Sequence, residues 1–412
     1  MELETLIQDY FGNRANKRRS TDSVHFELHW ERDLVRLLED FNDRTLVPFI
    51  YAFVVGEPRP REVIACLMQM KILQHHFDLA VRPLVEARLT DSTFNNRVGY
   101  GIDRAIAKVR DDIRRVSRNY TRDCYIIERD IRAFFPSTDL ARSYEGYRSL
   151  IEANIPEGKE RDDLLFILQR VNFAYPQEHA ELRSPRYKWD GLIASGKSVV
   201  FNNDPAKGAC LGNQYWQVEK NYALADFDRM QVEGGLAYTR YVDDMVWVVE
   251  NKRAALNWIV TCEKMLREDY GYEMHPRKRY CQHYSKGVRF LGAGIKFGRI
   301  YASERALRNC RAALRRWNRR ASAMQLSHFL STANSYLGLL QHRDAYGKIR
   351  DLAELVSPAW LRFCHYDDAR RCFVANKGYG HIEILTRRYN FTLYRQTHKN
   401  KRYGCKNTTS AA

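Results

Sequence analysis

Two adjacent aspartates, Asp243 and Asp244, lie inside the apolar and aromatic segment AYTRYVDDMVWVV at residues 237–249. The residues on either side favour β-strands, and Tyr241 and Met245 do not suit an exposed loop. A tight hairpin with the aspartates at its turn satisfies both demands, because aspartate tolerates turn geometry while the strands are buried. Carboxylates at such a turn need a counter-ion, or burial raises their pKa until they become neutral.

A third carboxylate, Asp130, lies near the end of a second apolar segment, CYIIERDIRAFF at residues 124–135. Two strands that each deliver an aspartate at one end can converge on two Mg²⁺ ions roughly 4 Å apart, an arrangement used for phosphoryl transfer. Mg²⁺ suits such a site because it takes few carboxylates and completes its shell with water and substrate phosphates. The two segments therefore predict a site for two Mg²⁺ ions, with Mn²⁺ as a substitute.

The tripeptide YDD is not sufficient for this prediction, because it recurs at residues 366–368. The second segment, CHYDDARRCF, is typical of a helix N-terminus, where Asp367 and Asp368 would cap the helix and complement its dipole. We expect this second pair to be structural.

The remaining chain alternates helical and extended patterns. Helices are predicted over most of 1–50, and over 67–90, 103–118, 140–195, 211–230, 253–270 and most of the chain from 303. Two short strands are expected on either side of residues 56–60, where prolines forbid helix. Pro136-Ser137 is expected to open a helix, and residues 287–301 are typical of strands.

Composition limits the class of protein. A length of 412 residues predicts two or three subdomains, and a net charge of +17 favours a polyanionic partner, most commonly nucleic acid. Nine cysteines without CxxC spacing indicate a reducing compartment, and neither a disulfide framework nor a zinc site. The first residues are acidic, and no apolar run is long enough to span a membrane. We expect a cytoplasmic protein without membrane contact.

Five segments follow one another in the order RDIRAFF, GACLGNQYWQ, YVDD, HPRKRY and RFLG. This series resembles the palm motifs of reverse transcriptases, and GEPRPREV and NRVGYGID upstream resemble that family's finger motifs. The resemblance covers residues 45–300 and implies an α+β right-hand polymerase fold. It divides the chain into an N-terminal helical basic extension (1–44), fingers (45–120), an antiparallel palm with a helical insertion near 140–200 (121–302), a helical thumb (303–376) and a basic aromatic tail (377–412).

The resemblance also implies roles for individual residues. Asp130 and Asp243 would bind both metal ions, assisted by Asp244 and the backbone carbonyl of Ile131, and Lys278 would be the general acid for pyrophosphate. Further positions would contact dNTPs or the primer: Arg61 and Lys71 for the triphosphate, Phe135 to exclude a ribose 2′-hydroxyl, Leu211, Gly212 and Gln217 near the incoming nucleotide, and Phe290, Leu291 and Gly292 at the primer end. From the residues alone, core packing of Phe135 and a solvated Lys278 remain alternatives.

The segment LGNQYWQ resembles the matching motif of diversity-generating retroelement reverse transcriptases, although Trp216 stands where that pattern has serine. This bacterial or phage-encoded type copies a template-repeat RNA into cDNA with errors at adenines. It works with a small, basic, oligomeric accessory variability protein. An antiphage-defence or retron-type reverse transcriptase that uses a dedicated non-coding RNA remains an alternative. A catalytically idle RNA-binding or splicing-assisting protein is an alternative of another class.

Residues 305–320 contain seven arginines and no acidic residue. Arg308, Arg311, Arg315 and Arg319 recur at three- and four-residue spacing, which predicts one basic helix face opposite an apolar face. Such a face would follow the phosphates of template RNA and cDNA, although a solvated surface is the alternative. The tail from Lys377 combines basic and aromatic residues that could bind structured RNA.

Overall fold

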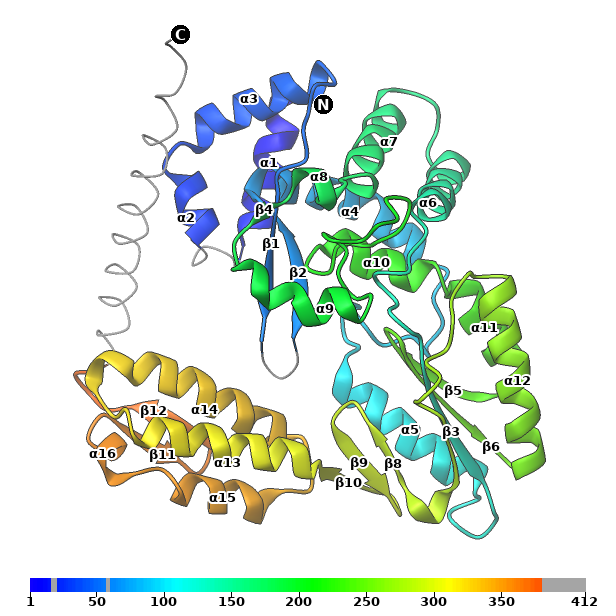
Figure 1. Cartoon of the computed structure of the whole chain (residues 1–412), viewed down its shortest axis with the longest axis vertical. Helices are drawn as coiled ribbons and strands as arrows, with labels where there is room; N and C mark the ends of the chain where they lie inside the picture. The colour runs from blue at the N-terminus through cyan, green and yellow to red at the C-terminus, as the bar shows by residue number, and fades with distance from the viewer. Residues whose placement is uncertain (16–20, 57–59, 380–412) are drawn as a thin grey trace. The chain divides into compact units, whose positions relative to one another are not determined.

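The computed structural model describes residues 1–15, 21–56 and 60–379 (Figure 1). The chain divides into two compact units, a first unit of Met1–Lys286 and a second unit that begins at Gly287. Both units combine helices and β-sheets, as expected for an α+β chain. The finer division into fingers, palm and thumb remains a prediction.

A four-stranded antiparallel sheet in the first unit has the strand order β5-β6-β3-β7. Its strands are β3 (Tyr125–Asp130), β5 (Ala237–Tyr241), β6 (Asp244–Val249) and β7 (Tyr280–His283). The predicted hairpin is confirmed, because β5 and β6 pair directly and leave only two residues between them. Branched and aromatic residues dominate these strands, as their β-propensity requires.

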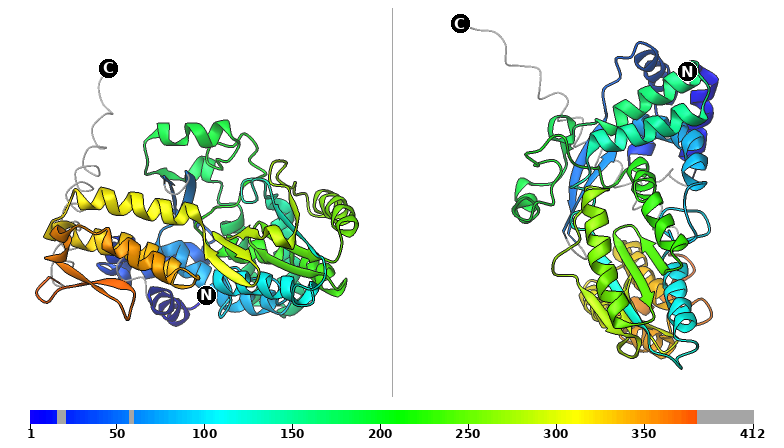
Figure 2. Two further views of the ribbon diagram at one scale, coloured as in Figure 1. Left: turned by 90° about the horizontal axis from the view of Figure 1, so that it is seen from below. Right: turned by 90° about the vertical axis from the view of Figure 1, so that its right-hand side faces the viewer.

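Helices cover both faces of this sheet. Figures 1 and 2 show the strands between α5 (Ile102–Val116) and α12 (Lys252–Glu268). Ile127 and Trp247 share a buried core with Leu266 of α12 and with α11 (Ala225–Glu233). Side chains alternate along a strand, so Asp130 and Asp244 project from the opposite face.

A second core of the first unit surrounds α4 (Met68–Glu86). The helices α1 (Leu3–Arg14), α2 (Thr21–Glu27) and α3 (Trp30–Asn42) confirm the helices predicted before residue 50, and β1 (Ile50–Val55) and β2 (Arg61–Cys66) confirm the two strands. The helices α6 (Leu140–Asn154), α7 (Lys159–Asn172) and α10 (Gln214–Tyr222) contact α4. The remaining elements before α10 are α8 (Pro176–His179), α9 (Asp190–Ala194) and an unpredicted β4 (Glu181–Leu182), which pairs with β1.

Two predicted helix boundaries in the first unit are wrong. Pro136-Ser137 does not open a helix, because α6 begins only after Asp139, whose carboxylate accepts a hydrogen bond from the Arg142 backbone N–H at 3.0 Å. Residues 211–230 do not form one helix, since α10 ends at Tyr222 and α11 begins at Ala225. Leu224 at this break is fully buried, so packing sets the direction of each piece.

The second unit begins with a three-stranded meander of β8 (Val288–Phe290), β9 (Ala293–Lys296) and β10 (Arg299–Ala302). Four helices follow, α13 (Glu304–Asn318), α14 (Leu326–Gln341), α15 (Tyr346–Glu354) and α16 (Pro358–Leu361). Their core contains Trp360 stacked on Phe329, with ring centroids 4.3 Å apart. The helices expected from residue 303 are therefore confirmed over this range.

The predicted helix N-terminus at the second YDD is wrong. Residues there form a hairpin of β11 (Cys364–Asp367) and β12 (Cys372–Ala375), in which Tyr366 pairs with Phe373. Asp367 nevertheless has a structural contact, because its carboxylate accepts a hydrogen bond from the Arg370 backbone N–H at 3.0 Å. Cross-strand aromatic packing outweighs the local capping pattern here.

Several expectations concern features of the whole chain. The eight cysteines in the described part of the chain are free, in agreement with the predicted absence of a disulfide framework. Over the same residues, no helix is both long and apolar enough to cross a lipid bilayer. The tail predicted to bind RNA begins at Lys377, and the part of it beyond Tyr379 lies outside the described residues.

Candidate active site

The structure brings together the three aspartates that the sequence singled out. Asp130 and Asp244 are direct partners in the ladder between β3 and β6, so their Cβ atoms lie about 5 Å apart. Asp243 lies in the two-residue turn between β5 and β6. The Ile131 backbone N–H donates a hydrogen bond to the Asp243 carbonyl at 3.2 Å, which ties the end of β3 to this turn.

Negative charge is concentrated and poorly solvated at this edge of the sheet. Asp130 is 5% exposed, and its Oδ1 is buried without a hydrogen-bond partner. Burial, together with the charges of Asp244 and Asp130, raises the pKa of Asp243 well above its usual range. Burial and the charge of Asp244 also raise the pKa of the neighbouring Glu128 to about 7. An unbonded carboxylate oxygen among mutually repelling carboxylates fits a bound cation.

Metal binding by the three aspartates remains a prediction. Across residues 1–15, 21–56 and 60–379, no three Asp, Glu, His or Cys side chains are gathered closely enough to enclose an ion by themselves. Mg²⁺ usually binds one or two carboxylates and takes its other ligands from water and phosphates. Asp130, Asp243 and Asp244 supply carboxylates of this kind. The predicted contribution of the Ile131 carbonyl remains a prediction.

Lys278 lies beside these carboxylates, in the loop that precedes β7. Its Nζ forms an ion pair with Asp130 Oδ2. Burial acts to lower the pKa of Lys278, but the hydrogen bond and charge of Asp130 and the charges of Asp244 and Asp243 outweigh burial and raise it. The side chain therefore carries its proton at neutral pH, as a general acid must before it acts.

Arg129 fixes this loop from the other face of β3, and sequence reasoning missed it. Its side chain is almost fully buried, donates from Nη1 to the Lys278 carbonyl at 3.2 Å, and pairs with Glu263. The His275 backbone N–H donates to the Asp130 carbonyl at 2.7 Å, a second link between loop and strand. A charged residue within an apolar strand was the available signal, because an arginine there must find buried partners.

A second buried arginine, Arg240, was also missed. Arg240 and Asp228 form an ion pair at 2.5 Å, and neither side chain is exposed. Asp228 also accepts hydrogen bonds from the hydroxyls of Tyr238 at 2.8 Å and Thr93 at 2.6 Å. This network is joined to the turn that carries Asp243, because Arg240 Nη1 donates to the Val242 carbonyl at 3.2 Å.

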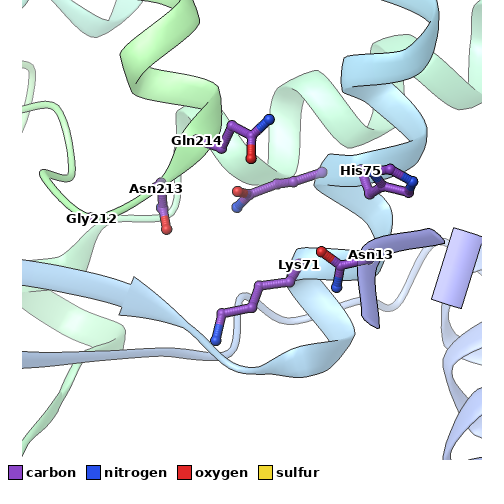
Figure 3. A pocket seen from close by; sticks show the side chains of 7 residues that line it. Asn13, Lys71, His75, Gly212, Asn213 and Gln214 are labelled. Atoms are coloured by element: carbon purple, nitrogen blue, oxygen red, sulfur yellow. The ribbon is translucent and has the colours of Figure 1, made fainter. Parts of the chain in front are cut away.

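The structure brings Lys71 and Gly212, two predicted nucleotide-binding residues, into one pocket (Figure 3). Gly212 has a φ of +123°, and a Cβ there would lie 2.9 Å from the Ile64 carbonyl oxygen, so this position requires glycine. The Leu211 carbonyl accepts a hydrogen bond from the Ile64 N–H at 2.7 Å. The pocket is lined by Asn13, Lys71, Gln74, His75, Gly212, Asn213 and Gln214.

The other residues of the first unit that were predicted to contact the incoming nucleotide do not line this pocket. Arg61 is exposed at the start of β2 and does not line this pocket, and Gln217 is half-buried on α10. Phe135 is half-buried and packs against both cores of the first unit. Core packing therefore accounts for part of its surface, and its role in excluding a 2′-hydroxyl remains a prediction.

Predicted nucleic-acid contacts of the second unit lie on two elements. Leu291 and Gly292 form the turn between β8 and β9, both with positive φ, and Phe290 is buried. Their predicted contact with the primer end remains a prediction. The amphipathic character of α13 is confirmed, because Leu307, Cys310, Ala313 and Leu314 are buried whereas Arg308, Arg315 and Arg319 are exposed and Arg311 is half-exposed.

Comparison with known proteins gave no family model and no curated protein that matches the chain. Telomerase structures are similar at low identity. The apo telomerase of Candida tropicalis truncated from its C-terminal domain has a TM-score of 0.43, with 10% identity over 62% of this chain and 55% of that chain. Telomerase from Candida albicans with a TWJ fragment of telomeric RNA has a TM-score of 0.39, with 8% identity over 77% of this chain and 61% of that chain. The chain thus spans little more than half the length of these structures.

Proposed function

We propose that this protein is an RNA-directed DNA polymerase. The observation that carries the proposal is the direct pairing of Asp130 with Asp244 across β3 and β6, with Asp243 in the adjoining turn. Two-metal nucleotidyl transfer uses carboxylates held at fixed positions, and the ends of these paired strands would hold them there. Two Mg²⁺ ions bound there would stabilise the negative charge on the attacking and leaving oxygens.

The residues around the aspartates have matching tasks in this proposal. Lys278 holds a proton beside Asp130, and it can donate that proton to the departing pyrophosphate once substrate phosphate replaces Asp130 as its partner. Lys71, opposite Gly212 in the pocket, supplies a cation for the triphosphate. Template RNA and cDNA bind the arginines of α13 through their phosphates.

The finer assignment follows the motif LGNQYWQ. We propose the diversity-generating type, which copies a template-repeat RNA into adenine-mutagenised cDNA, uses dNTPs and works with an accessory variability protein. Leu211 supports this choice, because an aliphatic side chain cannot hydrogen-bond to a nucleotide and so constrains base-pair geometry weakly.

Primer extension tests the proposal. Purified protein should extend a DNA primer on an RNA template in the presence of four dNTPs and Mg²⁺, and EDTA should abolish extension. RNA binding without any extension, in Mg²⁺ or Mn²⁺, would contradict the proposal and favour an idle RNA-binding protein.

A further inference from the structure

Val242, the first central residue of the turn before Asp243, has an unfavourable backbone conformation. Its φ is +58°, whereas Asp243 has no positive φ. A two-residue hairpin turn with a positive φ at its first central residue alone follows the type II′ pattern, which prefers glycine there. A β-branched residue with positive φ is an outlier, and it persists only where the surrounding structure enforces it.

Two side chains from outside the turn bind the peptide groups on either side of Val242. The Val242 N–H donates a hydrogen bond to Asn95 Oδ1 at 3.0 Å. The Val242 carbonyl accepts one from Arg240 Nη1 at 3.2 Å. Asn95 is 2% exposed and Arg240 is fully buried, so water does not compete for either side chain.

Arg240 is itself held rigidly. Its Nε donates to both carboxylate oxygens of Asp228, at 2.8 and 2.9 Å, and its Nη2 donates to Asp228 Oδ2 at 2.5 Å. Its backbone N–H donates to the Ser92 carbonyl at 2.8 Å, and its carbonyl accepts from the Phe94 N–H at 3.0 Å. The segment that carries Asn95 is thus joined to β5 by backbone hydrogen bonds.

Asn221 of α10 links the two side chains that bind Val242. Its Nδ2 donates to the Asn95 carbonyl at 2.8 Å, and its own carbonyl accepts from Arg240 Nη2 at 3.4 Å. Asn95, Val242, Arg240 and Asn221 therefore form a closed circuit of hydrogen bonds. Asn95 Nδ2 and Asn221 Oδ1 are buried without a hydrogen-bond partner, so not every polar group of the circuit is satisfied. The closed circuit nevertheless favours one arrangement of the turn.

We propose that Asn95 and Arg240 are positioning residues that hold Val242 in its strained conformation and thereby place Asp243 beside Asp130. This inference rests on the proposed function, because it assigns the network a role at the metal-binding carboxylates. Without the network, the turn relaxes to a geometry that valine prefers, and Asp243 moves away from its place opposite the end of β3. Divalent cations then bind more weakly.

Asn95→Leu tests the inference, because leucine is close to asparagine in size and removes the acceptor for the Val242 N–H. The Mg²⁺ concentration for half-maximal primer extension should rise roughly five- to tenfold, the value of one buried hydrogen bond. Glycine adopts positive φ without strain, so Val242→Gly in the same chain should return this concentration to within about twofold of wild type. A residue that only stabilises the fold would not show this recovery.

Asn172→Leu is the matched control. Asn172 is 2% exposed, donates to the Leu140 carbonyl at 2.7 Å and accepts from the Tyr215 hydroxyl at 2.9 Å, and neither partner belongs to the turn. This variant should lose thermal stability but keep the Mg²⁺ dependence of the wild-type protein. Adding Val242→Gly to Asn172→Leu should leave that Mg²⁺ dependence unchanged.

Mn²⁺ affinity, measured by electron paramagnetic resonance on protein without primer or dNTPs, separates this inference from the proposed function. If wild type binds Mn²⁺ and extends no primer, the proposed function fails. Weaker Mn²⁺ binding by Asn95→Leu, with recovery by Val242→Gly, would still support the inference. Equal Mn²⁺ affinity of wild type and Asn95→Leu, at equal folded fraction, overturns the inference. Absence of Mn²⁺ binding to the wild-type protein at millimolar concentration overturns the inference, whereas primer extension alone decides the proposed function.

Discussion

Asp243 is a residue at which function and stability oppose each other. Burial and the neighbouring carboxylates raise its pKa, so the native state retains a proton that the unfolded chain releases. For an acid with a raised native pKa, this contribution to stability is present below the unfolded pKa and is lost as pH rises.

Asp243→Asn should therefore stabilise the protein in metal-free buffer. At pH 8 we expect the free energy of unfolding to rise by about 1–2 kcal/mol, and we expect the difference from wild type to shrink near pH 4. Urea unfolding at the two pH values, with EDTA present, measures this. A variant that is less stable than wild type at pH 8 would show that the carboxylate is not under electrostatic strain.

Phe135 is the residue whose bulk is predicted to select dNTPs. Its ring is only partly covered by the two cores of the first unit, so part of it is available to a substrate. Phe135→Ala should increase incorporation of ribonucleotides relative to deoxyribonucleotides by about tenfold or more, equivalent to about 1.4 kcal/mol. Single-nucleotide extension measures the ratio, and an unchanged ratio would assign Phe135 to core packing alone.

Leu211 tests the diversity-generating type. Its backbone is fixed by the hydrogen bond with Ile64, whereas its side chain is half-exposed. Wild type should misincorporate preferentially opposite template adenine, and Leu211→Gln should lower this error roughly ten- to thirtyfold, the effect of one or two polar contacts. Sequencing of cDNA from a defined RNA template measures the errors. Equal error rates at all four template bases would contradict the diversity-generating assignment but would leave the polymerase assignment standing.

The helix α13 is the element with the clearest prediction for nucleic-acid binding. Arg311 and Arg315 lie on its solvent-facing side. Reversing both to glutamate should reduce the slope of log affinity for RNA against log salt concentration by about 1–2, because each phosphate contact releases counterions. Lys348→Glu with Arg350→Glu, two exposed cations on α15 of the same unit, is the control. Equal slopes for the two double variants would show that the arginines of α13 do not contact RNA phosphates and are only solvated.

Elements with a strong local pattern were predictable, and those set by distant partners were not. Strand-favouring residues on both sides of two turn-tolerant aspartates were enough for the hairpin of β5 and β6, and helical periodicity was enough for α4, α5 and α13. In contrast, β4 forms only because β1 offers it an edge, and β11 and β12 form a hairpin where a capping pattern suggested a helix. In each case a tertiary contact outweighed the local preference.

At the scale of the whole molecule, the candidate site combines residues from distant parts of the chain. The aspartates were predictable because charge within an apolar strand is visible locally. Asn95 was not, because its contact with Val242 spans 147 residues. Arg129 and Arg240 likewise appear in the sequence only as isolated charges in strands, and their partners become evident only in the folded chain.

The two YDD tripeptides provide a direct test of the polymerase assignment within one chain. Asp243 lies beside Asp130 in the first unit, whereas Asp367 contacts the Arg370 backbone in a hairpin of the second unit. We predict that Asp243→Asn abolishes Mg²⁺-dependent extension of a DNA primer on an RNA template and leaves RNA affinity within about threefold, because metal binding and phosphate binding use different residues. Asp367→Asn should extend primers at a rate within about threefold of wild type. Extension by purified Asp243→Asn protein at a rate near that of wild type would contradict the assignment.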